Sequence, residues 1–243
     1  MKNFFIVGAQ RCATSWLYEA LDKQQGIHMI KPRVPELKFF LQKPPYITRH
    51  HYLQLCKEGI NGEKSTTYIE STPAATRIKK TFPKAKVIIC LRNPVQRALS
   101  NYFFSCSSGL ETRTLKEAFI TNTRHPAISL KTSTNPFAYI ERGMYSKYIE
   151  AYKSIFPASQ IFITFMEKFT KDLKEFELLV RWLGKEGEID FNLPHNVNSS
   201  ARDQIVSGEV FSHLASYYQN DTAALIKNHH LFPPYADSLT QPV

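Results

Sequence analysis

The sequence predicts an α/β fold, in which helices flank a central, mainly parallel sheet. Two observations support it. Short apolar runs of strand length alternate along the chain with longer segments whose apolar residues recur at helical spacing. The 243 residues are 43% hydrophobic, which is enough to bury a sizeable core, and they contain no internal repeat or low-complexity stretch. We therefore expect residues 1–243 to form a single domain.

Each predicted element follows from its local pattern. Strands are expected at residues 2–8, 62–66, 86–92 and 161–165. The run KVIICLR at 86–92 is the clearest, because a continuous β-branched run is typical of a strand buried on both faces. Helices are expected at residues 14–23, 71–82, 95–105, 115–122, 137–156, 171–183, 206–218 and 222–228. Polar or Pro-rich stretches at 31–40, 43–51 and 187–202 are expected to be loops, the first leading into a short element.

The charge balance is the unusual feature of the composition. The chain has 31 Lys and Arg against 21 Asp and Glu, a formal net charge of +10. This surplus favours an anionic partner, and nucleic acid, a membrane surface, a nucleotide and an acidic polysaccharide all remain open. No apolar run approaches the roughly 18 residues that span a bilayer, and the N-terminal run is too brief for a signal peptide. We expect no membrane anchor.

Cysteine and histidine usage predicts neither a disulfide framework nor a metal site. The four cysteines are scattered without a CxxC pair, and without an export signal they are expected to be thiols in a reducing cytoplasm. Four of the eight histidines form two adjacent pairs, His50-His51 and His229-His230, which cannot chelate a metal as i,i+4 pairs do.

The loop after the first strand, residues 8–15 (GAQRCATS), is predicted to bind phosphate. It joins a strand to a helix, so that backbone N–H groups and the helix N-terminus face one ligand, and Arg11 adds a charge. The spacing is close to the P-loop pattern GxxxxGK[ST], but Ala13 replaces its second Gly and Thr14 replaces its Lys. The loop is therefore P-loop-like, and a plain strand–helix turn with a capping Thr is the structural alternative.

Two further clusters of cations and hydroxyls follow predicted strands. Lys64 lies near the end of the second predicted strand, and Arg92 ends the third, with Ser100 two turns into the next helix. Because the carboxyl ends of parallel strands lie at one edge of a sheet, we expect these residues near the first loop. An Arg and a Ser can hold one phosphate from two sides, so the three clusters indicate a ligand with two separate phosphate groups.

In these segments the sequence resembles the sulfotransferases that use 3′-phosphoadenosine 5′-phosphosulfate (PAPS), above all the heparan sulfate N- and O-sulfotransferase type and its bacterial relatives. Residues 8–15 resemble the 5′-phosphosulfate loop, and EKSTTY at 63–68 resembles the EKS-x-x-Y segment. Residues 91–102 resemble the 3′-phosphate motif LR-[DN]-P-x-x-R-x-x-S-x-Y. RGMY at 142–145 resembles the later G-x-Y turn, and NSSAR at 198–202 resembles the late loop that closes over the nucleotide.

The resemblance implies a set of residues that bind PAPS and its product 3′-phosphoadenosine 5′-phosphate (PAP). They are Gln10, Arg11, Cys12, Ala13, Thr14 and Ser15 in the first loop, Arg92 and Ser100 at the 3′-phosphate, and Tyr145, Ser200, Ala201 and Arg202 in the later segments. The family usually has Lys where Arg11 stands, and it often has Gly at the next two positions. Its late loop often has Lys-Gly before the Arg, which this chain lacks.

The resemblance also implies a mechanism. Glu36 matches the Glu of the family's K-E-x-x-F-F segment and would act as general base on an acceptor hydroxyl or amine. The acceptor would attack sulfur in line with the bridging oxygen to the 5′-phosphate, while Lys64 and Arg11 offset the charge that develops there. No metal is required, because the protein supplies the cations. Lys38 stands where many bacterial relatives have His, so a His base is not available at that position.

Two other functions stay open at this stage. A P-loop-like nucleotide kinase would need the missing lysine and a magnesium-binding Asp, and a nucleic-acid-binding module rests on the net charge alone. The partners expected are the nucleotide and an acceptor, a glycan or a small metabolite, whose contacts would come from residues 42–55 and 107–135. We expect no nucleic-acid partner and a cytoplasmic, bacterial enzyme, and the oligomeric state is open.

Overall fold

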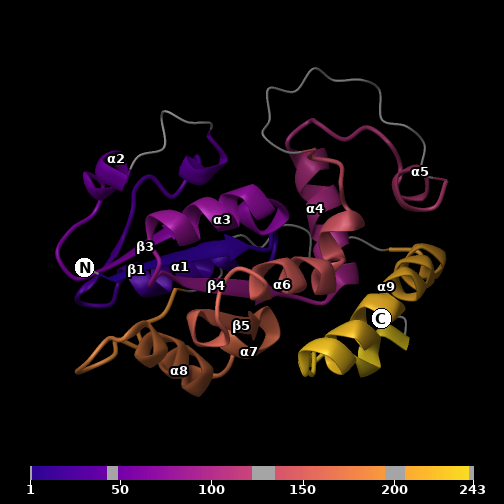
Figure 1. Cartoon of the computed structure of the whole chain (residues 1–243). Helices are drawn as coiled ribbons and strands as arrows, with labels where there is room; N and C mark the ends of the chain where they lie inside the picture. Colours follow the sequence, from indigo (N-terminus) through magenta and orange to yellow (C-terminus); the bar gives the residue numbers. More distant parts are fainter. Residues whose placement is uncertain (1, 43–48, 122–134, 195–205, 241–243) are drawn as a thin grey trace. The chain divides into compact units, whose positions relative to one another are not determined.

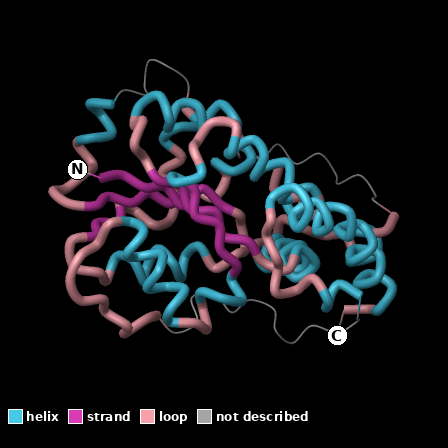
Figure 2. Tube along the Cα trace, turned by 60° about the horizontal axis from the view of Figure 1, so that its bottom comes forward, coloured by secondary structure: helices cyan, strands magenta, loops and turns pink. Residues whose placement is uncertain are grey.

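The computed structural model describes residues 2–42, 49–121, 135–194 and 206–240. Five parallel strands form one sheet in the order β2-β3-β1-β4-β5 (Figures 1 and 2). Their bounds are β1 Lys2–Gly8, β2 Ile27–Met29, β3 Ile60–Lys64, β4 Lys86–Leu91 and β5 Ile161–Phe165. Since β3 and β4 lie on opposite sides of β1, the strand order reverses around β1, and in such sheets ligands bind beyond the carboxyl ends at that point. The predicted α/β class is confirmed.

Nine α-helices accompany the sheet in the described part of the chain. They are α1 (Thr14–Asp22), α2 (Arg49–Leu53), α3 (Thr72–Thr81), α4 (Pro94–Ser107), α5 (Leu115–Phe119), α6 (Tyr145–Lys153), α7 (Met166–Phe169), α8 (Leu173–Leu183) and α9 (Gly208–His229). Contacts divide the chain into two compact units. The sheet unit comprises residues 1–91 and 150–198, and the helical unit comprises residues 92–149 and 199–243.

Aromatic side chains fill both faces of the sheet in the sheet unit. On one face the Phe5 ring of β1 lies 5.5 Å from Phe40 and 5.8 Å from Tyr52 of α2. On the other, the Trp16 ring of α1 lies 5.5 Å from Phe169 of α7 and 6.0 Å from Phe176 of α8. Figure 1 shows α2 and α3 on one side of the strands, with α7 and α8 on the other. Both faces are therefore covered, which explains the continuous apolar strands.

The helical unit is built around α4, α5 and α9, with a core of tyrosine and phenylalanine. The Tyr102 ring lies 5.6 Å from Phe119 and 5.8 Å from Tyr139. Beside them Arg113 pairs with Glu111 at 2.7 Å, and Tyr139 donates to the same carboxylate at 2.8 Å. The buried polar groups of this core thus satisfy one another.

The prediction of one helix over residues 137–156 is wrong in its first half. Residues 141–143 form a single 3-10 turn, and α6 begins only at Tyr145. The backbone N–H groups of Tyr145 and Ser146 donate to the Asp221 carboxylate at 2.8 and 3.1 Å, which starts a new helix there. Gly143 packs so closely on Tyr218 that a Cβ would come within 2.6 Å of its ring. Tertiary contacts therefore interrupt the single helix that the spacing of apolar residues predicts.

Most other elements differ from prediction at their ends, but α7 was not predicted and α2 begins inside the stretch 43–51 that was expected to be a loop. The second predicted strand, 62–66, is shifted to Ile60–Lys64, and the short strand β2 was not predicted. The two helices predicted at 206–218 and 222–228 form the single helix α9, since the polar residues between them continue the helix. Asp221 lies in that stretch and binds the start of α6, so its polarity serves a tertiary contact.

Candidate active site

A glycine allows the loop after β1 to pass closely over the neighbouring segment. Gly8 has φ +153°, and a Cβ there would lie 2.6 Å from Cγ2 of Ile69 and 2.9 Å from the Thr66 carbonyl oxygen. The next residue, Ala9, donates its N–H to the Cys90 carbonyl of β4 at 2.7 Å. The loop is thus fastened between the ends of β3 and β4, where the strand order reverses.

The backbone of this loop has the conformation of an anion cradle. Arg11 and Ala13 both lie in the left-handed region, with φ of 65° and 55°. Such residues turn successive N–H groups toward a common point. Ala13 is the N-cap of α1 and its side chain caps nothing, and the first turn of α1 holds no acidic residue. The capping-Thr alternative is therefore not formed, and the helix N-terminus favours negative charge.

The side chains of the loop divide between the core and the surface. Thr14 and Cys12 are buried, and the Cys12 thiol lies 3.6 Å from the Gln10 carbonyl. Cys12 could therefore offer a ligand only its backbone N–H. Gln10, Arg11 and Ser15 are half-buried and stand at the loop surface.

Glu36 and Lys64 form a nearly buried ion pair at the end of β3. The Lys64 Nζ lies 2.5 Å from the Glu36 Oε1, and the two side chains are 4% and 15% exposed. Thr66 binds the same carboxylate, donating its N–H to Oε2 at 2.9 Å and its hydroxyl to Oε1 at 2.9 Å. Three hydrogen bonds from Lys64 and Thr66 therefore fix the Glu36 carboxylate at the carboxyl edge of the sheet.

A second carboxylate, Glu63, is linked through hydrogen bonds to the segment that carries Glu36. Its Oε1 accepts from the Ser65 hydroxyl at 2.8 Å and from the Tyr68 hydroxyl at 2.5 Å. Those hydroxyls in turn accept backbone N–H bonds from Lys38 at 3.0 Å and Phe40 at 2.9 Å. The network ties the segment that carries Glu36 to β3.

The Glu63 carboxyl has an unusual acidity because it is fully buried. Burial raises its pKa to about 7, and the hydrogen bonds from Tyr68 and Ser65 only partly oppose that rise. The negative charge of Glu36 adds to it. Sequence reasoning gave no role to Glu63, Ser65 or Thr66, although their polarity inside a strand end was a signal that they make buried hydrogen bonds.

The helical unit holds the second predicted region, at the start of α4. Asn93 caps the helix, its side chain accepting from the N–H groups of Val95 and Gln96 at 3.0 and 3.2 Å. Arg92, just before the cap, is half-buried, and its carbonyl accepts from the Tyr145 hydroxyl at 2.9 Å. The described contact of Tyr145 is thus with the main chain of Arg92, and its contact with a nucleotide stays a prediction.

Other charged and hydroxyl groups of this region differ in burial. Arg97 is fully buried and donates to the Tyr139 carbonyl, so it belongs to the core of the helical unit. Ser100 is 9% exposed on α4. The predicted late-loop residues Ser200, Ala201 and Arg202 lie outside the described residues.

The described ranges hold neither a metal-binding cluster nor a membrane-spanning helix. There, no group of three or more His, Cys, Asp or Glu side chains could hold a metal ion. Nor is any helix in those ranges long and apolar enough to cross a membrane.

The chain is similar in sequence to several curated sulfotransferases. It is 30% identical over 203 residues to the bifunctional heparan sulfate N-deacetylase/N-sulfotransferase 1 of Homo sapiens, covering 78% of this chain and 23% of that protein. It is 27% identical over 177 residues to the heparan sulfate glucosamine 3-O-sulfotransferase 3B1 of Mus musculus, covering 69% and 42%. Over 109 residues it is 30% identical to the membrane-associated sulfotransferase kil1 of Dictyostelium discoideum, covering 43% and 23%. The chain thus spans less than half the length of these relatives.

The chain is also similar in fold to solved sulfotransferase structures. A sulfotransferase from Alicyclobacillus acidocaldarius has the same fold, with a TM-score of 0.76, 23% identity and 99% of each chain covered. The sulfotransferase domain from the curacin biosynthetic pathway aligns at a TM-score of 0.50 and 13% identity, over 77% of this chain and 76% of that one. The sulfotransferase domain family itself matches residues 1–232. Since this match runs through nearly the whole sequence, the chain belongs to the sulfotransferase domain family.

Proposed function

We propose that the protein transfers a sulfonate group from PAPS to a hydroxyl or amine of an acceptor. The observation that carries the proposal is the Glu36–Lys64 pair, held by Thr66 at the edge where the cradle of residues 8–15 lies. A carboxylate suited to accept a proton and a cation suited to meet developing negative charge are there only 2.5 Å apart. When bound, PAPS supplies an activated sulfonate and a phosphate leaving group.

The residues present fit a ligand of this charge. The cradle offers backbone N–H groups, including that of Thr14, the uncapped N-terminus of α1, Arg11 and the Ser15 hydroxyl. A Cβ at Gly8 would clash with residues 66–69 and would prevent the loop from lying so close to them. In the helical unit, we assign the 3′-phosphate to Arg92 and Ser100, following the family motif. Contacts from Ser200, Ala201 and Arg202 are part of the same proposal.

Each residue of the proposed catalytic group has a separate task. Glu36 accepts the proton of the acceptor group, and the Thr66 N–H and hydroxyl keep its carboxylate in place. The Lys64 ammonium has three donors, one of which is on Glu36, so two can serve a phosphate oxygen. Arg11 adds a second cation beside the cradle. These cations would do the work that a metal ion does in phosphoryl-transfer enzymes.

We propose a saccharide as the acceptor. The support is that relatives at 27% and 30% identity carry names that specify heparan sulfate as the acceptor. We further propose that residues 1–243 make one sulfotransferase domain, because the family match runs through both units. A cytoplasmic location and a bacterial source stay predictions.

The test is transfer of labelled sulfate from PAPS to a panel of glycans and hydroxylated or aminated metabolites. We expect transfer by the wild type, its loss in Lys64→Ala, and in Arg92→Ala a weakened affinity mainly for PAP. Lys171→Ala, an exposed charge on the sheet unit, serves as the control. Wild-type affinity for PAP in both Lys64→Ala and Arg92→Ala would contradict the proposal.

The same panel separates the two alternatives. Magnesium-dependent phosphoryl transfer from ATP would favour a nucleotide kinase. A gel shift with nucleic acid and no PAPS-dependent transfer would favour a binding module. Sulfation of small metabolites alone would replace the saccharide acceptor but keep the reaction.

A further inference from the structure

A cavity of about 380 Å³ lies at the amino edge of the sheet, the edge opposite the phosphate cradle. The first residues of β1, β3 and β4, the turn before β4 and the end of α8 line it. A strand of seven residues separates this cavity from the cradle by about 20 Å. The cavity falls within the size range of small-ligand sites. It is therefore a separate place from the proposed active site.

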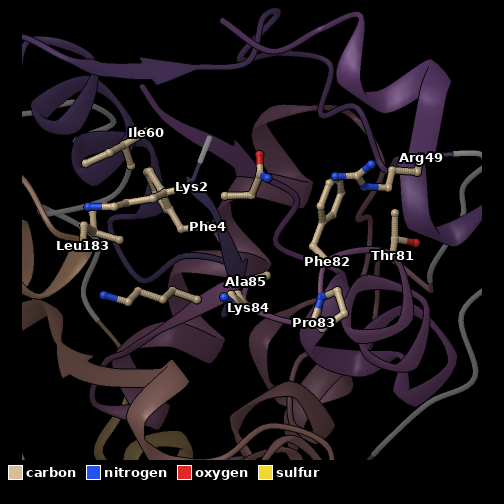
Figure 3. A pocket seen from close by; sticks show the side chains of 12 residues that line it. Lys2, Phe4, Arg49, Ile60, Thr81, Phe82, Pro83, Lys84, Ala85 and Leu183 are labelled. Carbon is tan, nitrogen blue, oxygen red and sulfur yellow. The ribbon is translucent and has the colours of Figure 1, made fainter. Parts of the chain in front are cut away.

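The wall of the cavity is cationic on an apolar floor. Lys2, Arg49, Lys84 and Lys86 line it, and among the described residues no Asp or Glu does. Phe4, Ile60, Phe82 and Leu183 supply apolar surface. Figure 3 shows Lys2 and Leu183 on one side of the cavity, with Arg49 and Phe82 on the other.

The cations of the wall are held in place without being neutralised. The Lys2 ammonium donates to the Gly184 carbonyl at 3.2 Å, and the Lys86 ammonium donates to the Trp182 carbonyl. Both carbonyls belong to the C-terminal end of α8, where a helix favours cations. In the described residues, none of the wall cations forms an ion pair with a carboxylate. Each ammonium therefore keeps donors for another acceptor.

The wall cations also repel one another. The pKa of Lys86 lies below its usual value, first because the side chain is partly buried and second because of the charge on Lys2. A negative group between these two ammoniums would remove that repulsion. Arg49 lies over the Phe82 ring, 5.9 Å from its centroid, so one part of the cavity places a cation directly on an apolar surface.

We propose that this cavity binds a small amphipathic anion, with its anionic group between Lys2 and Lys86 and its apolar body against the apolar lining described above, chiefly Ile60 and Phe82. The charge of the wall selects for an anion, and the floor selects against a bare inorganic ion. Such an anion could be a free metabolite or the headgroup region of an anionic lipid. The cavity volume of about 380 Å³ suits a free small molecule, to which the proposal commits.

The test is calorimetric titration of the full chain with hexyl sulfate below its micellar range. We expect saturable 1:1 binding, and at least about tenfold weaker binding of hexanol and of inorganic sulfate, because each lacks half of the recognition. The double variant Lys2→Gln/Lys86→Gln should also bind hexyl sulfate about tenfold more weakly or worse. Lys171→Gln/Lys174→Gln removes the same charge from exposed positions near α8 and should leave the affinity unchanged.

Each outcome decides the proposal, and PAP affinity shows that both variants are folded. Equal affinity of the two double variants, equal affinity for hexanol and hexyl sulfate, or no saturable binding would overturn it. Binding to phosphatidylglycerol vesicles without binding of hexyl sulfate would overturn it in favour of a lipid surface. Because PAP binds at the other edge, loss of hexyl sulfate binding with intact PAP binding also separates this proposal from the proposed function.

Discussion

The two edges of the sheet both carry cations, but they treat them differently. At the carboxyl edge, Lys64 is nearly buried against Glu36 at 2.5 Å, and Thr66 fixes that carboxylate. At the amino edge, four cations share one cavity wall with no carboxylate among the described lining residues. The Glu36–Lys64 ion pair keeps its two side chains in a defined geometry for a reaction, whereas cations without a carboxylate partner attract an anionic ligand. The pairing of charges, rather than their number, therefore distinguishes the proposed roles.

The largest effect is expected from breaking the matched pair at the carboxyl edge. Glu36→Gln keeps the shape of the side chain but cannot accept the acceptor proton, so kcat for sulfate transfer should fall by about 10²- to 10⁴-fold. Steady-state assays with PAPS measure it, with Glu188→Gln, an exposed glutamate, as the control. PAP binding should stay close to that of the wild type. Retention of more than a tenth of wild-type kcat would remove Glu36 from the role of base.

The carboxylate below the pair should make stability depend on pH. Glu63 has a pKa of about 7 when folded, well above its value in an unfolded chain, so the folded state binds the extra proton. Its contribution is fully present below pH 4.5 and is lost as the pH rises through 7. Between pH 5 and 8 the unfolding free energy of the wild type should therefore fall, relative to Glu63→Gln, by about 3 kcal/mol.

Urea unfolding of both proteins at several pH values measures this difference. The buried tyrosines next to Glu63, Tyr52 and Tyr68, have pKa values raised well above 10 and do not titrate in this range. A constant difference between wild type and Glu63→Gln from pH 5 to 8 would show that Glu63 stays ionised in the folded protein.

An ion pair in the helical unit should give the opposite slope at lower pH. Burial raises the pKa of Glu111, but the hydrogen bonds and charge of Arg113 and the Tyr139 hydroxyl outweigh it and lower the pKa to about 2. This stabilisation is present above the unfolded pKa and is lost as the pH falls from about 4.3 toward 2. Relative to Glu111→Gln, the wild type should lose on the order of 1–2 kcal/mol there, because Arg113 keeps some contact with solvent.

Acid unfolding followed by circular dichroism measures this slope. Arg113 donates to both carboxylate oxygens of Glu111, at 3.0 and 2.7 Å. Arg113→Lys tests the cause of the slope, since Lys keeps the charge but cannot form this two-pronged contact. An identical acid response in Glu111→Gln and the wild type would mean that the pair does not stabilise the folded state.

The sequence predicted the sheet well because its strands are short, continuous and buried. β1 and β5 coincide with their predictions, and the loop after β1 was identified from its residues alone. Periodicity failed where tertiary contacts decide, as at Gly143 against Tyr218 and at Asp221 beneath the start of α6. The sequence also did not predict which residues contact each other. Glu36 and Lys64 were each predicted as site residues, but their contact and the hydrogen bonds around Glu63 depend on the fold. The amino-edge cavity has no sequence motif, since its cations come from three separate segments of the chain.

The smallest effect is expected from removing one cation, Lys84, from the wall of the amino-edge cavity. Lys84 is exposed and has no ion pair in the described residues, so Lys84→Gln should change the unfolding free energy by no more than about 0.5 kcal/mol. The sign is informative, because removing one of four like charges should stabilise the protein. The gain should be larger at about 0.02 M salt than at about 0.5 M, where charges are screened within a few ångströms. A loss above about 1 kcal/mol that disappears at high salt would reveal a stabilising ion partner of Lys84, and the two edges would then differ in degree rather than in kind.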